Sequence, residues 1–198
     1  MNDAASIALV VAAYFMGSIP FGLLIGKKMG VDVRGVGSGN IGATNVARNL
    51  GKKVGALVLL LDSLKAAIPT FVAKMLVSRG ELAIEFLALV AIAAIIGHCY
   101  PVWLKFRGGK GVATSLGVFL VIDPALAGIG VAIFAVLYLA FRTASIGSVC
   151  AAIAFPVLLW LFERPMPLVQ LGIAGAVIIV VKHRTNILRL LRGEEHRV

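Results

Sequence analysis

Long apolar runs separated by short polar segments make up most of this chain. Seven such runs occupy residues 4–26, 54–77, 82–103, 111–122, 124–141, 144–162 and 166–181. A helix needs about 20 apolar residues to cross roughly 30 Å of hydrocarbon. Residues 111–122 fall short because Asp123-Pro124 ends the run, which predicts a half-length helix that ends inside the protein. The pattern predicts an all-α polytopic membrane protein with seven transmembrane helices, the fourth of them short.

Composition supports a membrane protein. The 198 residues are 60% hydrophobic and 14% charged, whereas an average soluble domain is about 25% charged. The mean hydropathy is +1.01. A chain with so few charges needs a bilayer around most of its surface, and we expect one integral membrane domain over 1–198.

The distribution of basic residues predicts the orientation. With the N-terminus outside, only three lie on the outer side (Lys74, Arg79 and Arg164), and Lys65 lies within a helix. Basic residues gather on the cytoplasmic side of membrane proteins, which places the C-terminus in the cytoplasm. The fifteen predicted inner residues are Lys27, Lys28, Arg34, Arg48, Lys52, Lys53, Lys105, Arg107, Lys110, Arg142, Lys182, Arg184, Arg189, Arg192 and Arg197.

The net charge of +10 has two explanations. One is the cytoplasmic excess of basic residues common in membrane proteins, and the other is an anionic substrate. The inner segments 34–48, 105–114 and 182–195 favour the second, because they combine basic residues with glycine, serine, asparagine and threonine. Flexible, lipid-facing loops are the plainer alternative, but they would not need the glycines.

Glycine patterns in these loops invite two nucleotide-binding interpretations, and neither fits. Gly37 to Gly42 spells G-x-G-x-x-G, but that motif works between a strand and a helix. Lys110 is followed by glycine rather than by the Ser or Thr of a phosphate-binding P-loop. Backbone N–H groups of such loops still form anion-binding nests. We therefore predict a phosphate site, with charge from Arg34, Arg48, Arg107 and Lys110 and hydrogen bonds from Ser38, Asn40, Thr44 and Asn45.

Histidines and intramembrane charges complete the candidates. His183 and Asn186 share a helical face, where His183 is either a phosphate ligand or proton acceptor or a plain interfacial residue. Asp62 and Lys65 are three apart inside an apolar run and are expected to pair. We favour helix capping for His98 and a solvated position for His196. Three histidines and two distant cysteines, Cys99 and Cys150, predict buried thiols, with no metal site and no disulfide.

The three inner motifs resemble those of the PlsY family, the bacterial acyl-phosphate:glycerol-3-phosphate acyltransferases. They are Gly37-Ser38-Gly39-Asn40-Ile41-Gly42-Ala43-Thr44-Asn45 with Arg48, Gly108-Gly109-Lys110-Gly111-Val112-Ala113-Thr114, and His183-Arg184 with Asn186-Ile187 and Arg189-Leu190. The resemblance covers essentially the whole chain. Ala66 departs from it, where the family pattern has glycine, and this affects a packing detail.

The resemblance implies transfer of an acyl group from acyl phosphate to glycerol 3-phosphate, giving 1-acylglycerol 3-phosphate (lysophosphatidic acid) and phosphate for phospholipid synthesis. It implies no cofactor and no metal, a soluble PlsX-like phosphate acyltransferase as the source of the donor, and the bacterial inner membrane with the site near the cytoplasmic face. We expect a monomer surrounded by membrane lipid and no nucleic-acid partner.

The implied site residues fall into two groups. Catalytic roles go to Ser38, Arg48, Lys110, His183 and Asn186. Substrate binding is assigned to Gly37, Gly39, Asn40, Gly42, Thr44, Asn45, Gly108, Gly109, Gly111, Thr114, Ser145, Ser148 and Arg184. We favour direct attack over an acyl-Ser38 intermediate, because no acidic partner completes a Ser-His arrangement. An organophosphate transporter is the main alternative function, although no internal repeat supports it.

Overall fold

A computed structural model describes residues 3–195, so His196 and Arg197 lie outside the described part. Ten α-helices and one short 3₁₀ helix, η1, follow one another in it, and the described residues contain no strand. The helices are α1 (Asp3–Gly17), α2 (Phe21–Lys28), α3 (Ala43–Leu50), α4 (Lys52–Ser78), α5 (Ile84–Cys99), η1 (Val102–Leu104), α6 (Val112–Ile122), α7 (Pro124–Phe141), α8 (Ala144–Leu161), α9 (Met166–Lys182) and α10 (Arg184–Leu191). The all-α prediction is confirmed.

Five helical stretches are long and apolar enough to cross a membrane: Asp3–Lys28, Lys52–Ser78, Ile84–Leu104, Pro124–Phe141 and Ala144–Leu161. The pair α9 and α10, bent by 57°, adds a sixth if it is counted as one span. The short helix α6 matches the weak fourth run of the sequence. Large apolar side chains such as Val136 (65% exposed) and Leu139 (64% exposed) point outward, as expected for surfaces that face lipid.

The first apolar run is interrupted, which its hydropathy does not reveal. Helix α1 ends at Gly17 and α2 begins at Phe21, after Pro20. Proline lacks the N–H needed to continue a helix and restricts the residue before it. The Ser18 hydroxyl, which lies at the break, donates to the Tyr14 carbonyl at 2.8 Å, so this hydroxyl has a hydrogen-bond partner.

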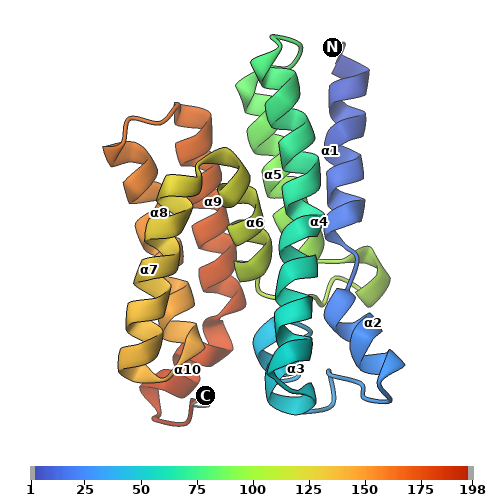
Figure 1. Cartoon of the computed structure of the whole chain (residues 1–198), viewed down its shortest axis with the longest axis vertical. Helices are drawn as coiled ribbons and strands as arrows, with labels where there is room; N and C mark the ends of the chain where they lie inside the picture. Colours follow the sequence, from blue (N-terminus) through green and yellow to red (C-terminus); the bar gives the residue numbers. More distant parts are fainter. Residues whose placement is uncertain (1–2, 196–198) are drawn as a thin grey trace.

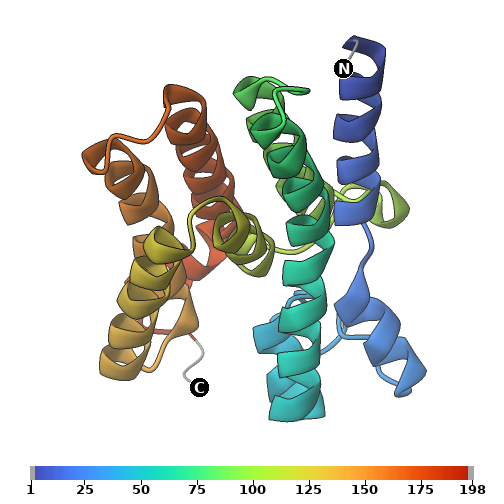
Figure 2. The same cartoon turned by 45° about the horizontal axis from the view of Figure 1, so that its top comes forward.

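Helices on opposite sides of the bundle pack on each other both through α6 and directly, α5 against α9. Figures 1 and 2 both show α1, α4 and α5 on one side, α7, α8 and α9 on the other, and α6 between them. Glycines permit close contact in this arrangement. A Cβ at Gly117 of α6 would lie 2.0 Å from the Ser63 carbonyl oxygen of α4, and one at Gly97 of α5 would lie 2.2 Å from the Tyr14 carbonyl oxygen of α1.

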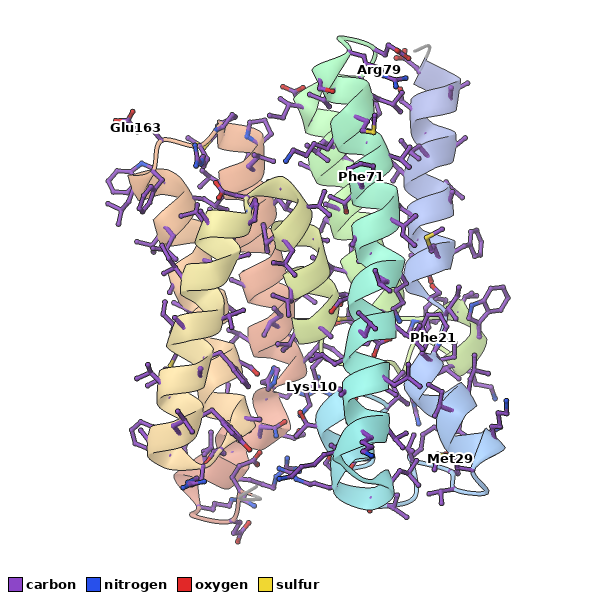
Figure 3. All side chains as sticks on the ribbon, viewed as in Figure 1. Phe21, Met29, Phe71, Arg79, Lys110 and Glu163 are labelled. Carbon is purple, nitrogen blue, oxygen red and sulfur yellow. The ribbon has the colours of Figure 1, made fainter. Side chains whose placement is uncertain are left out.

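The polar segments gather at one end of the bundle. Figure 1 shows α2, α3 and α10 together at the end that carries the C-terminus, with the N-terminus at the opposite end. Figure 3 places Lys110 between the two helix groups, nearer the end marked by Met29 than the end marked by Arg79 and Glu163. The fold therefore brings the inner loops of the sequence toward a common region.

Candidate active site

Asn45 fixes the shape of the loop between α2 and α3. Its side-chain amide donates to the carbonyls of Val33 and Asn40, both at 2.9 Å, and to that of Val36 at 3.1 Å. Its Oδ1 accepts from the Ser38 backbone N–H at 2.9 Å. The side chain is 2% exposed, so these bonds form in a sheltered place. Asn45 thus positions Ser38 and Asn40.

Two glycines of this loop, Gly37 and Gly39, determine its backbone conformation. Gly37 and Gly39 have φ values of +58° and +68°, a region that favours glycine. A Cβ at Gly37 would lie 2.4 Å from Asn45 Oδ1. Replacing either glycine would therefore disturb the backbone that presents Ser38.

The loop between η1 and α6 packs on the end of α5. A Cβ at Gly108 would lie 2.2 Å from the His98 carbonyl oxygen, and one at Gly109 would lie 2.0 Å from Nε2 of the same histidine. Gly111 has a φ of +87° and begins the turn into α6. These glycines let the loop pass close to His98 and present Lys110 on its other side.

Hydrogen bonds connect Lys110 to α10 and to the C-terminal segment. Lys110 Nζ donates to Asn186 Oδ1 at 2.5 Å. The Asn186 amide nitrogen donates to Glu195 Oε1 at 2.6 Å and to Ser145 Oγ at 3.3 Å. The Glu195 carboxylate also accepts from Ser145 Oγ at 2.5 Å and from Arg189 Nε at 2.7 Å. Donors of four kinds thus converge on or beside one anionic group.

The carboxylate of Glu195 shows that the hydrogen-bond donors around it can bind an anion. Ionised oxygens form short, strong bonds with such donors, and phosphate oxygens use the same donors. Burial alone would raise the pKa of Glu195, but the hydrogen bonds from Ser145, Asn186 and Arg189 outweigh it and lower the pKa below its usual value. The cluster therefore stabilises negative charge.

The surroundings of Lys110 lower the pKa of its side-chain amine. Its partial burial, first of all, lowers the pKa to about 8, and the nearby Arg189, Arg48 and Lys182 add to this effect while Glu195 opposes it. An ordinary lysine stays charged well above pH 9. A phosphate bound beside Lys110 would favour its charged form.

A polar cavity of about 140 Å³ lies where these segments meet. It is lined by residues of each helix from α3 to α8, of α10, and of the loops before α3 and α6, so residues far apart in sequence share one space. Twelve residues that the sequence nominated line it: Ser38, Asn40, Gly42, Thr44, Asn45, Arg48, Lys110, Gly111, Ser145, Ser148, His183 and Asn186.

Six nominated residues do not line the polar cavity. The four glycines Gly37, Gly39, Gly108 and Gly109 support the loops behind it, as their close contacts show. Thr114 is fully buried in α6, where its hydroxyl donates to the Gly111 carbonyl at 3.0 Å. Arg184 is exposed at the start of α10. These six residues lie behind or beside the cavity, and their direct contact with substrate stays a prediction.

His183 is buried at the junction of α9 and α10, with its Nδ1 2.8 Å from the Ile179 carbonyl oxygen. A carbonyl oxygen can only accept, so Nδ1 carries the proton in this arrangement. In the neutral ring, Nε2 then has a lone pair that can accept a proton or a hydrogen bond. This geometry suits the proton-acceptor alternative for His183.

Three residues that line the cavity, Asp62, His98 and Glu195, were not among the site residues expected from the sequence. The predicted pairing of Asp62 with Lys65 is confirmed, since Lys65 Nζ lies 2.8 Å from Asp62 Oδ1. Asp62 and His98 also line the cavity, with His98 Nδ1 3.7 Å from the same oxygen. The helix-capping prediction for His98 is wrong, because its ring is buried beside Asp62 and Gly109. No sequence pattern pointed to Glu195, which lies in the polar C-terminal segment, as a site residue.

A second, apolar cavity of about 590 Å³ adjoins the polar one. It runs between α4 and α6 on one side and α7, α8 and α9 on the other. Its volume is within the range of small-molecule sites. Eight residues line both cavities: Ala43, Thr44, Leu59, Val112, Ala113, Phe134, Ala144 and Ser148. A ligand with an anionic head and an apolar tail fits this combination.

No group of three or more His, Cys, Asp or Glu side chains within residues 3–195 is arranged to hold a metal ion. The donors that converge are amides, hydroxyls and cations, which bind anions.

Comparison with known proteins points to one family. Residues 7–193 match the family model for glycerol-3-phosphate acyltransferase. A glycerol-3-phosphate acyltransferase of an Anaeromyxobacter species is 52% identical over 100% of this chain and 99% of its own length. The enzyme of that name from Syntrophotalea carbinolica is 48% identical over 96% of this chain and 95% of its own.

Solved structures agree with the sequence matches. The crystal structure of PlsY, an integral membrane glycerol 3-phosphate acyltransferase, in its glycerol 3-phosphate form has a TM-score of 0.93 and 42% identity, covering 98% of this chain and 96% of that one. The lysophosphatidic acid form gives a TM-score of 0.90 and 41% identity, covering 98% and 95%.

Proposed function

The chain belongs to the glycerol-3-phosphate acyltransferase family, and we propose that it transfers an acyl group from an acyl phosphate to the 1-hydroxyl of glycerol 3-phosphate. The products are 1-acylglycerol 3-phosphate (lysophosphatidic acid) and inorganic phosphate. It is a membrane acyltransferase and not the transporter considered from sequence. The observation that carries the proposed donor is the junction of a cationic cavity with an apolar one.

Two phosphate groups account for the polar half of the site. Arg48, Lys110 and Asn186 hold the phosphates of the donor and of glycerol 3-phosphate, supported by the serines of α8, and His183 lies beside them as a candidate proton acceptor. Ser38, Asn40 and Thr44 orient the reacting carbonyl and hydroxyl. Bound glycerol 3-phosphate has been seen in a PlsY that is 42% identical to this chain, and this supports the assignment of that substrate.

The acyl tail occupies the apolar cavity. Its mouth at Val112, Ala113 and Phe134 is shared with the polar cavity, so the carbonyl carbon lies where the two meet. The neighbouring form of PlsY with lysophosphatidic acid supports an acyl-bearing ligand in such a site. Burying the tail anchors the donor and leaves its phosphate among the cations.

Transfer is direct. The glycerol 3-phosphate hydroxyl attacks the acyl carbonyl carbon, and the bond to the phosphate oxygen breaks, which releases phosphate with the bonding electrons. The hydroxyl proton goes to His183 Nε2 or to a substrate phosphate oxygen. Fixed donors such as Lys110 and Asn186 stabilise the developing charge, and preorganised donors of this kind supply large rate effects.

The site faces the cytoplasm of a bacterium from its inner membrane. We place seven crossings in one domain over 1–198, with α6 as a short fourth, the N-terminus outside and the C-terminus inside. The polar loops and α10 lie at the end of the bundle that carries the C-terminus, and this supports the orientation (Figure 1). A soluble PlsX-like enzyme supplies the acyl phosphate, and the protein works as a monomer.

A donor-specificity assay tests the proposal. Purified protein in detergent receives glycerol 3-phosphate with palmitoyl phosphate, palmitoyl-coenzyme A or palmitoyl-acyl carrier protein. We expect product and an equal amount of phosphate from palmitoyl phosphate alone. Product from the thioesters without phosphate release would refute the donor, and an acyl-Ser38 adduct trapped in a single turnover would refute direct transfer.

A further inference from the structure

The apolar cavity ends at the same depth on four helices. Its last lining residues are Phe119 on α6, Ala127 on α7, Phe155 on α8 and Gly172 on α9. Each helix continues beyond that residue, away from the polar cavity, without lining the apolar one. Along the helix axes the cavity therefore ends at these four residues.

The depth of that end follows from helix geometry. Val112 and Ser148 line both cavities, and each lies seven residues from the last lining residue of its helix. Seven residues of an α-helix rise about 10 Å. This length is shorter than the roughly 15 Å of one hydrocarbon leaflet. An acyl tail that runs along the helix axes would therefore meet these residues before it crosses one leaflet.

Two aromatic rings form the end. The ring centroids of Phe119 and Phe155 are 3.9 Å apart with an interplanar angle of 35°. The two side chains are 6% and 7% exposed, and Leu126 and Leu159 of the hydrophobic core are almost fully buried. Such a packed core resists insertion of additional methylenes. The rings thus have little room to move aside.

We propose that the Phe119–Phe155 pair sets the acyl-chain length that this enzyme prefers. The inference rests on the proposed function, in which the tail lies in this cavity. Each methylene buried before the tail reaches the rings improves the rate at low donor concentration about fourfold. A methylene beyond that point finds no space, so the gain stops or reverses.

Removal of one ring tests the proposal from one direction. Phe155→Ala opens the end of the cavity, and we expect the optimum of kcat/KM to move to longer tails. Octanoyl, decanoyl, dodecanoyl, myristoyl and palmitoyl phosphates are the probes. The ratio of dodecanoyl to octanoyl phosphate should rise at least tenfold over the wild-type ratio, while the KM for glycerol 3-phosphate stays unchanged.

Added bulk tests it from the other direction. Ala152 lines the same cavity on the same helix and lies about one turn nearer the polar site than Phe155. Ala152→Leu should move the optimum to shorter tails. This variant keeps both rings, so it tests the depth of the cavity even if Phe155→Ala does not fold.

Leu87→Ala is the matched control. Leu87 is a buried core residue of α5, and α5 does not line the apolar cavity. Its truncation leaves a hole in the core without touching the tail, so stability should fall while the chain-length profile stays that of the wild type. A shifted profile in this control would mean that loosened packing, rather than the rings, changes the preference.

The outcomes separate this inference from the proposed function. An unchanged profile in both Phe155→Ala and Ala152→Leu, with active wild-type enzyme, overturns the ring pair as the determinant and leaves the reaction intact. A wild-type enzyme inactive with all five acyl phosphates instead refutes the proposed donor, and the inference falls with it.

Discussion

At the scale of single residues, the proposed chemistry depends on a few cationic side chains that would bind phosphate. Lys110 lies at the centre of this group, because it contacts Asn186 and lies in the partly buried space between the two helix groups (Figure 3). Arg48 lines the same cavity from α3. Their removal should affect catalysis far more than folding.

Lys110→Ala should lower kcat/KM for glycerol 3-phosphate by at least about 100-fold, the usual effect of losing one preorganised donor to developing charge. Lys105→Ala, in the same loop but outside the cavity lining, is the control and should retain most activity. Circular dichroism and thermal unfolding would check that both variants fold. A wild-type rate for Lys110→Ala would overturn the assignment.

The pKa of Lys110 gives a pH prediction. Burial lowers it to about 8, so the amine is charged below that pH and loses its proton, and its hold on phosphate, as the pH rises through 8. We expect kcat/KM to fall about tenfold per pH unit above 8. In Lys110→Arg this decline should disappear, because a guanidinium stays charged. An identical decline in that variant would show that another group titrates.

Removal of the negative charge of Glu195 should strengthen, rather than weaken, the binding of glycerol 3-phosphate. Its carboxylate occupies donors that a substrate phosphate would use, namely Ser145, Asn186 and Arg189. Glu195→Gln should therefore lower the KM for glycerol 3-phosphate by about threefold, in line with a partly screened charge interaction. Glu194→Gln, at an exposed neighbour, should leave KM unchanged. A raised KM in Glu195→Gln would mean that the carboxylate supports the site instead of competing for it.

At the scale of helices and loops, the sequence predicted what depends on local pattern. The seven apolar runs coincide with helices, and the polar inner segments supply most of the cavity lining. The break at Pro20 follows from a proline, whose effect on a helix hydropathy does not measure. The place of His98 against Gly109 depends on a contact between segments distant in the sequence. The role of the Glu195 carboxylate could not be predicted either, because its partners come from α8 and α10.

Close packing of α6 on α4 gives a prediction about stability. Gly117→Ala would place a methyl group 2.0 Å from the Ser63 carbonyl oxygen, a backbone atom that cannot move without shifting α4. We expect a loss of about 1–3 kcal/mol, typical of overpacking, measured as thermal unfolding in detergent. Gly128→Ala in α7, where no atom lies within 4 Å, should be neutral or slightly stabilising. Equal stability of the two variants would contradict the close contact.

At the scale of the whole molecule, two halves of the bundle enclose a site that neither could form alone. The polar cavity takes residues from the loop before α3, from the loop before α6 and from α8 and α10. The apolar cavity beside it is walled by helices of both halves. Sequence could nominate the polar residues of this site, but the depth and end of the apolar cavity emerge only from the packed helices.

The orientation of the bundle is open to a labelling test. In a background with Cys99→Ala and Cys150→Ala, a cysteine at Glu163 should react with a membrane-impermeant maleimide in intact cells or spheroplasts. A cysteine at Arg192 should react only after lysis, because the excess of basic residues predicts that this end lies in the cytoplasm. The reverse pattern would contradict the predicted topology.

The most direct test of the account is a structure of this protein with glycerol 3-phosphate and a palmitoyl phosphonate, a stable mimic of the acyl phosphate. We predict both phosphorus groups within hydrogen-bond distance of the cluster around Lys110, Arg48 and Asn186, and the tail in the apolar cavity with its end toward Phe119 and Phe155. A phosphonate bound away from Lys110, or a tail that leaves the cavity empty, would contradict it.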